Sequence, residues 1–114
     1  YELDETYAEA VHNLGVVSSQ SGLHDKAIEY YDLAISLEPT YALAYKNLGL
    51  SRLSQGLYEQ AEFALQRAIS LDSSLTTAVV DGLSTALIQQ GKVQEGLNVK
   101  SWHDKEKQKK NSYE

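Results

Sequence analysis

The sequence predicts an all-α solenoid built from antiparallel helix pairs, and three observations lead to this prediction. A pattern of apolar and glycine residues recurs about every 34 residues along the 114-residue chain. Each copy of the pattern contains two apolar stripes with helical spacing, separated by a glycine. The chain has only one Pro and seven Gly, fewer breakers than the many tight turns of a β-sandwich or barrel normally need.

The repeat becomes visible when residues 8–41 are placed above residues 42–75. The coinciding pairs include Asn13 and Asn47, Leu14 and Leu48, Gly15 and Gly49, Gly22 and Gly56, Leu23 and Leu57, Ala27 and Ala61, and the run 34–37 with the run 68–71. A third copy begins one residue late, at an offset of 35, because the connector at 72–74 holds an extra residue. Chance similarity would not keep one spacing across so many apolar and glycine positions.

Each copy contains two helices of similar length. In the first copy the apolar spacing predicts helices over about residues 6–20 and 25–37. Gly22 is expected to end the first helix, because a residue without Cβ adopts positive φ easily. Pro39 is expected to stop the second helix, and Thr40 is expected to cap the next one.

This pattern resembles the tetratricopeptide repeat, a helix-turn-helix unit of 34 residues with the pattern W-x2-L-G-x2-Y, then A-x3-F, A and P. The first copy matches at Leu14, Gly15, Ala27, Tyr31, Ala34 and Pro39, and the second at Tyr45, Leu48, Gly49, Ala61 and Ala68. The third copy keeps Leu83 but has Ser84 for the glycine, Gly96 for an alanine, and Lys100 and His103 at positions that are normally buried.

The resemblance covers residues 1–99 and implies a right-handed superhelical solenoid of about three units, the last one diverged. The expected division is 1–7 as the end of a preceding repeat, 8–41 as the first unit, 42–76 as the second with its connector, 77–110 as a degenerate third unit or capping helix, and 111–114 as a tail. We therefore expect the chain to be a fragment of a longer array. In the last helix, Trp102 is expected to cover the end of the core rather than to anchor a partner.

Composition and charge exclude several classes of function. The formal net charge of −6 disfavours nucleic acid as the main ligand, since an acidic domain repels phosphate. The chain has no Cys, which excludes disulfides, thiolate nucleophiles and Cys-type zinc sites and fits a reducing compartment. We expect a cytoplasmic location and no membrane insertion, because no apolar run approaches the roughly 18 residues needed to span a bilayer.

No motif supports catalysis. The three His form no metal pair at i, i+4, and none of the phosphate-loop, dinucleotide or nucleophile-elbow motifs occurs. The glycines fall at repeat positions, where turns and helix packing explain them. We therefore expect no catalytic site, no metal and no cofactor.

The resemblance implies a concave face that is lined by the first helix of each repeat and binds peptides. The candidate groove residues carried over to this chain are His12, Asn13, Val16, Leu43, Lys46, Asn47, Leu50, Leu53, Asp81, Thr85 and Ile88. A ladder of Asn13 and Asn47 would bond an extended peptide backbone, because an amide both donates and accepts. The leucines of this set either meet a partner helix or are half-buried between adjacent helices, and the sequence leaves both readings open.

A chaperone-tail clamp needs Lys and Asn on the first repeat, Asn on the second, and Lys and Arg on the third. Asn47 matches the middle position, but His12 and Val16 replace the first pair, and Ala78 and Gly82 replace the last. Without these cations a C-terminal carboxylate would be poorly neutralised. We therefore expect no tight binding of acidic chaperone tails.

The resulting prediction is a non-catalytic scaffold that holds a protein or peptide partner in the groove. One alternative is a structural array that self-associates through an open N-terminal end, giving homo-oligomers. Another is the regulatory or substrate-docking part of a larger enzyme. The sequence names neither the partner nor the process.

Overall fold

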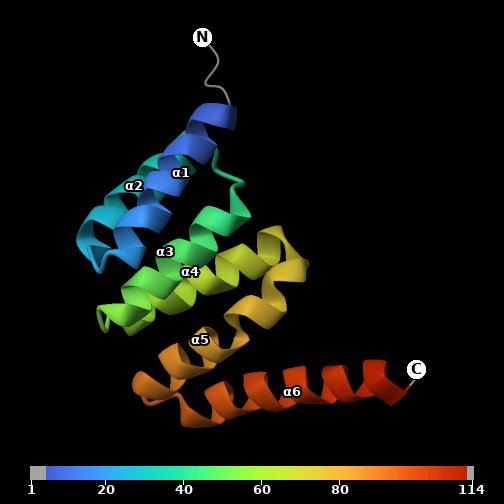
Figure 1. Ribbon diagram of the computed structural model, residues 1–114. Coiled ribbons are helices and arrows are strands. Elements are labelled where there is room, and N and C mark those ends of the chain that lie inside the picture. The colour runs from blue at the N-terminus through green and yellow to red at the C-terminus, as the bar shows by residue number, and fades with distance from the viewer. Residues whose placement is uncertain (1–4, 113–114) are drawn as a thin grey trace.

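The computed structural model describes residues 5–112. Within this part of the chain, six α-helices form one stack (Figure 1). Their bounds are α1 (Glu5–Gln20), α2 (His24–Leu37), α3 (Ala42–Ser54), α4 (Tyr58–Leu71), α5 (Thr76–Gln89) and α6 (Val93–Ser112), with a 3₁₀ turn at Ser73–Leu75 before α5. No strand occurs among the described residues. The predicted all-α solenoid is confirmed.

Each helix packs mainly on its neighbours in sequence. α1 pairs with α2, α3 with α4 and α5 with α6, while α2 contacts α3 and α4 contacts α5. The pairs pile up from the N-terminal to the C-terminal end, and α6 runs on past the stack (Figure 1). This arrangement of local contacts is the one-dimensional order of a solenoid, in which each repeat touches only its neighbours.

The three turns within the helix pairs share one geometry. Gly22, Gly56 and Gly91 have φ of +80°, +78° and +87°. In the first turn, the amide of Gly22 donates to the carbonyl of Ser19 at 2.9 Å, and the amide of Leu23 donates to that of Ser18 at 2.9 Å. The other two turns repeat both bonds, so all three are Schellman caps in which glycine takes the left-handed position. The role predicted for Gly22 is confirmed.

The connectors between repeats agree with the prediction only in part. α2 ends at Leu37, two residues before Pro39, as expected. Thr40 does not cap α3, so that prediction is wrong: Tyr41 takes the N-cap position without a side-chain bond, and its amide donates to the carbonyl of Glu38 at 3.0 Å. The backbone turn at Glu38 leaves Thr40 one residue too early to reach the helix end.

The longer second connector is held by Asp72. Its carboxylate accepts the amide of Ser74 at 3.0 Å and the hydroxyl of Ser74 at 2.6 Å. These two bonds lower the pKa of the Asp72 carboxyl, because they stabilise its charged form. The extra residue of the third copy is thus taken up by the 3₁₀ turn before α5 begins.

Small residues let the two helices of a pair approach closely. A Cβ atom added at Gly15 would lie 2.5 Å from the ring of Tyr31, and one at Gly49 would lie 2.7 Å from Leu65. Tyr31 and Leu65 are fully buried, and Ala27, in the same core cluster as Tyr31, has no exposed surface. In the first two pairs, the large side chain of the second helix therefore fills the space that glycine leaves on the first.

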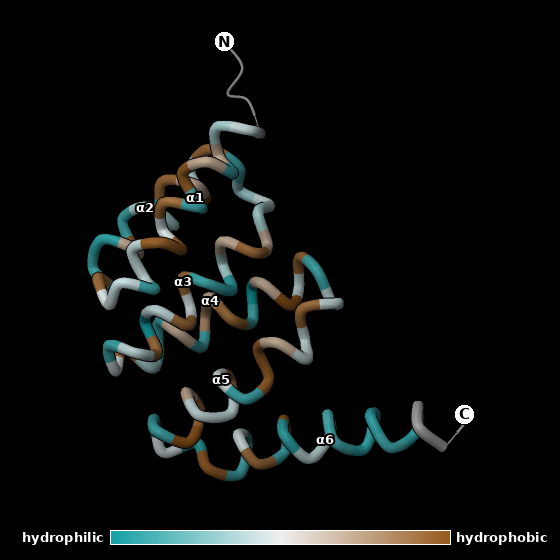
Figure 2. The backbone as a smooth tube through the Cα atoms, viewed as in Figure 1, coloured by the Kyte–Doolittle hydropathy of each residue, from teal (hydrophilic) through white to brown (hydrophobic). Residues whose placement is uncertain are grey.

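The terminal helix α6 packs through its first turns and is polar beyond them (Figure 2). Gly96 lies against Ile88 of α5, and its carbonyl accepts the hydroxyl of Ser84 at 2.9 Å. Trp102 is 57% exposed, so the prediction that it covers the end of the core is wrong. Gly96 and Val99 hold the contact with α5, and Trp102 lines a shallow pocket with Thr76 and Thr77 at the start of α5.

The predicted ends of the array fall largely on residues that the structure does not describe. Residues 1–4 and 113–114, parts of the predicted preceding repeat and tail, lie outside the described residues. Residues 5–7 form the first turn of α1. The division of the chain into repeat units remains a prediction.

Replacing Gly49 by Ala should destabilise the fold by about 1–2 kcal/mol. The new Cβ would overlap Leu65, and this overpacking outweighs the gain of about 1 kcal/mol in helix propensity. Urea unfolding monitored by circular dichroism measures the change. As a control, Ser101→Ala on the exposed side of α6 should stay within about 0.5 kcal/mol, and a Gly49→Ala variant as stable as the parent would refute the close-approach argument.

Candidate functional site

The candidate site is the face formed by the first helices of the pairs. α1 contacts α3, and α3 contacts α5, so the three first helices follow one another along the stack. We call the eleven predicted residues on this face the groove residues. They are His12, Asn13 and Val16 on α1, Leu43, Lys46, Asn47, Leu50 and Leu53 on α3, and Asp81, Thr85 and Ile88 on α5.

The groove residues differ widely in exposure. Asn13, Leu43, Asp81 and Thr85 are exposed, and Leu43 presents 38% of its surface. His12 is buried, at 3% exposure. The remaining six are half-buried, namely Val16, Lys46, Asn47, Leu50, Leu53 and Ile88. Fewer of the groove residues are therefore open to a ligand than the sequence predicted.

His12 joins the first two repeats beneath this face. Its Nε2 atom lies 2.8 Å from the Nδ2 atom of Asn47, so the amide donates to the ring across α1 and α3. The imidazole also lies between two tyrosine rings, with centroids 5.6 Å away at Tyr31 and 5.1 Å away at Tyr41. The Asn47 amide is therefore already engaged within the protein, which the sequence pattern of paired asparagines did not indicate.

The environment of His12 favours its neutral form. Burial lowers the pKa of His12, because the charged imidazolium loses its hydration. The ammonium of Lys46 acts in the same direction, while Asn13 and Glu9 act against it. A neutral ring is also what the contact with Asn47 needs, since Nε2 accepts only when it carries no proton.

The leucines of α3 are partly used for packing between successive first helices. A Cβ atom added at Gly82 of α5 would lie 3.2 Å from Leu50 and 3.4 Å from Leu53. Leu50 also packs against the buried cluster of Leu65 and Val79. Of the two readings left open by the sequence, half-burial describes Leu50 and Leu53. The signal was present, because Gly82 stands where the first two copies have Asn.

Arg52 of α3 is not one of the groove residues and forms an ion pair with α2. Its guanidinium lies 3.9 Å from the carboxylate of Asp32 on α2, which ties the first two repeats together. Burial raises the pKa of Asp32, and the charge of Arg52 opposes that rise. Arg52 stands in place of the tyrosine of the family pattern.

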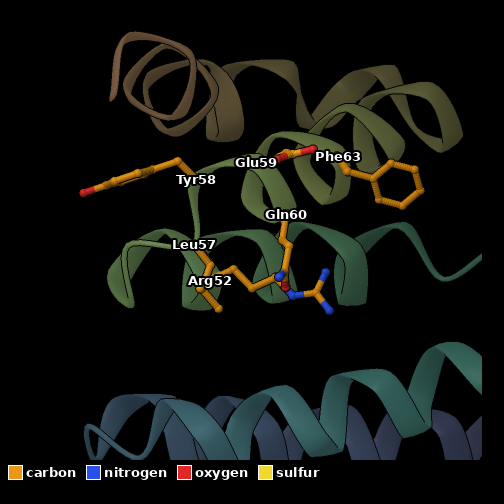
Figure 3. A pocket seen from close by; sticks show the side chains of 6 residues that line it. All are labelled: Arg52, Leu57, Tyr58, Glu59, Gln60 and Phe63. Carbon is orange, nitrogen blue, oxygen red and sulfur yellow. The ribbon is translucent and has the colours of Figure 1, made fainter. Parts of the chain in front are cut away.

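A shallow pocket lies outside the groove, where α3 ends and α4 begins (Figure 3). It is lined by Arg52, Leu57, Tyr58, Glu59, Gln60 and Phe63. In Figure 3 the rings of Tyr58 and Phe63 project to opposite sides, and Phe63 is 66% exposed. None of the groove residues lines this pocket. The sequence signal for it is Phe63 itself, which replaces Glu29 of the first copy.

Two models of the tetratricopeptide repeat match the chain, one over residues 8–41 and the other over residues 42–75. The chain belongs to the tetratricopeptide repeat family. The two matched segments coincide with the first two copies of the sequence pattern, and together they cover more than half of the chain. A comparison with curated proteins gives no match.

Solved structures of tetratricopeptide proteins resemble this one closely. A crystal structure of MamA protein is 30% identical with a TM-score of 0.85 over 98% of this chain, and a second MamA structure is 30% identical with a TM-score of 0.84 over 97%. This chain spans 61% and 64% of those two chains. The second tetratricopeptide domain of Spaghetti (RPAP3), bound to the HSP90 peptide SRMEEVD, is 28% identical with a TM-score of 0.79; the match covers 85% of this chain and 89% of that one.

The described residues contain no cluster of His, Asp or Glu that would hold a metal ion. Within the same part of the chain, every helix is too short or too polar to cross a membrane.

The stability of the protein should fall as the pH drops from neutral through the range where a free histidine titrates. Folding lowers the pKa of His12, so the unfolded chain takes up a proton at a higher pH than the folded chain does. The free energy of unfolding is therefore lost progressively below a pH of about 6.5. Urea titrations between about pH 7.5 and 5.5 measure this slope.

The variant His12→Gln supplies the comparison for this pH dependence. It removes the titrating ring and should make the slope shallower, at a cost of about 1–2 kcal/mol at neutral pH for the lost packing and hydrogen bond. An unchanged slope in His12→Gln would show that His12 does not carry the pH dependence.

Proposed function

We propose that this chain is a non-catalytic scaffold that binds a peptide or partner helix in the groove of first helices. The observation that carries the proposal is the row of exposed side chains on three successive first helices, Asn13 on α1, Leu43 on α3 and Thr85 on α5. The Spaghetti domain, a 28% identical tetratricopeptide structure, is bound to a peptide, which supports the same use of this fold. A cytoplasmic location belongs to the same proposal.

The chemistry of the open residues suggests the kind of ligand. Leu43, with Val16 and Ile88 half-buried near the same face, offers apolar surface for one or two side chains of a partner. Asn13 has an exposed amide that can bond a peptide backbone without reading its sequence. Asn47 is held by His12, so a ladder of two free asparagines is not part of the proposal.

A random peptide library displayed on phage tests the groove directly. Peptides are selected on the parent chain and then measured against two variants, Leu43→Glu with Thr85→Arg in the groove and Phe63→Glu at the pocket of Figure 3. All three substitutions are at exposed positions, so the helix content should be retained. We expect the groove variant to lose at least about tenfold in affinity and the pocket variant to keep the parent value.

Two outcomes contradict the groove. Peptides that bind all three proteins equally would place binding elsewhere, on the ends or on the second helices. Peptides that lose affinity only for Phe63→Glu would show that the binding site is the pocket between α3 and α4.

The peptide SRMEEVD should not bind tightly to this chain, although the Spaghetti domain binds it. At the positions of the carboxylate clamp this chain has His12, which is buried, and Val16, Ala78 and Gly82, which carry no charge. A carboxylate left without cations gains little from leaving water. Isothermal titration calorimetry should give a Kd weaker than about 100 μM, and micromolar binding would refute the prediction.

A further inference from the structure

The hydrogen bond between His12 and Asn47 decides which end of the Asn47 amide is left for a ligand. The Nδ2 atom of Asn47 lies 2.8 Å from the Nε2 atom of His12, so the NH2 group donates to the ring. The Oδ1 atom on the other side of the amide is not buried, and it accepts no hydrogen bond within the described part of the chain. Asn47 is half-buried on the face of first helices, so it presents this oxygen to the groove.

The ring of His12 is held firmly enough to set this orientation. His12 is 3% exposed, and the rings of Tyr31 and Tyr41 lie 5.6 Å and 5.1 Å from it. With Nε2 as the acceptor, the ring proton lies on Nδ1, which is buried and has no hydrogen-bond partner among the described residues. His12 therefore acts on other polar groups through Nε2, and a neutral ring can only accept there.

Titratable groups face His12 from α1, α2 and α3. Glu9 lies on the same helix and favours a charged ring, whereas Lys46 on α3 opposes one. The tyrosines that flank the ring, Tyr31 on α2 and Tyr41 before α3, are neutral phenols, and burial raises the pKa of both. Burial of the ring outweighs the effect of Glu9, so His12 keeps its acceptor at neutral pH.

The same pair does not recur at the next joint of the stack. Between α3 and α5, the positions of His12 and Asn47 are taken by Lys46 and Gly82. Glycine has no side chain that a neighbour could orient. Along the described face of first helices, an amide held in this way therefore occurs at one place, one turn after the exposed Leu43.

We propose that His12 is a positioning residue that makes Asn47 a hydrogen-bond acceptor in the groove, where an extended peptide donates a backbone N–H to it beside the side chain that covers Leu43. This inference rests on the function proposed for the groove. Leu43 and Asn47 are four residues apart on α3, so their Cβ atoms lie about 5–6 Å apart on one face. An extended peptide covers that span in about two residues. The residue that supplies the N–H cannot be proline.

Protonation of His12 should reverse the polarity of this site. A charged ring donates from Nε2, so the amide of Asn47 must turn its oxygen to the ring and its NH2 group to the groove. The peptide N–H would then face another donor. The affinity for the peptide should therefore fall in acid, by up to about tenfold per pH unit once His12 titrates in the folded chain.

Nitrogen-15 NMR of the free chain tests the orientation without a ligand. At pH 7.5 we expect the His12 proton on Nδ1, and we expect the side-chain NH2 signals of Asn47 to shift when His12 titrates. A ring that carries its proton on Nε2 at this pH would overturn the proposal, because Nε2 would then donate to the oxygen of Asn47.

Peptides selected on phage test the ligand. Those that lose affinity for the groove variant, Leu43→Glu with Thr85→Arg, are synthesised with blocked ends, and each backbone amide is N-methylated in turn. One methylation within about two residues of the apolar side chain should lower the affinity at least about tenfold. Asn47→Asp offers only acceptors and should keep this binding, whereas Asn47→Leu should lose it.

The pH profile separates positioning from a purely structural role. Peptides without ionisable side chains are measured from pH 7.5 to one unit below the pH at which NMR shows His12 to titrate. The affinity should fall for the parent but stay level for His12→Gln and for Asn47→Asp, which has no donor to turn toward the groove. His24→Gln is the matched control and should keep the parent profile, because His24 lies at the start of α2, outside the groove. Circular dichroism checks that each variant is folded at both pH limits.

The outcomes distinguish this inference from the function on which it rests. If no selected peptide responds to the groove variant, both are wrong. If groove peptides bind but tolerate every N-methylation, only the acceptor role of Asn47 is wrong. A parent affinity that does not change while His12 titrates also overturns the inference, and so does loss of binding in Asn47→Asp, since the ligand would then use the donor of the amide.

Discussion

The close approach of paired helices at Gly15 and Gly49 is the constraint on which the rest of the structure depends. Tyr31 and Leu65 occupy the space that a Cβ would fill, so each pair has one fixed offset along its axis. The Schellman turns at Gly22 and Gly56 then bring the second helix back at once. With the pair fixed, the next repeat can only stack beside it, and all first helices come to lie on one face of the stack.

Stacking uses part of the surface that a ligand would otherwise meet. His12 and Asn47 form a contact between the first two repeats, and Leu50 and Leu53 lie over Gly82 between the second and third. A polar contact thus joins the first two repeats, and an apolar contact joins the second and third repeats. The neutral state of His12 belongs to this arrangement, since a protonated ring could not accept from Asn47. Only side chains that take no part in these contacts between repeats remain available to bind a ligand.

The sequence predicted the elements well because the repeat encodes them locally. Helix ends follow from Gly22 and Pro39, and the offset of 34 residues transfers each assignment to the next copy. The prediction from the sequence failed where contacts join separate helices. Paired asparagines do not reveal that one of them meets a buried histidine. Trp102 falls at the repeat position of Leu33 and Arg67, which are both exposed, and the prediction did not use this signal. The prediction that Thr40 caps α3 failed for a local reason, because the backbone turns at Glu38 and residue propensities do not indicate this turn.

The two ends of the stack are chemically unlike, and this asymmetry follows from how a solenoid is built. Each first helix carries apolar residues for the repeat before it, so α1 presents Leu14 and Val17 whether or not a repeat is there to cover them. α6 differs from the other second helices, because it is mostly polar and basic past Leu97. An interface inside the array is buried by the chain itself, so sequence repetition maintains it without any partner.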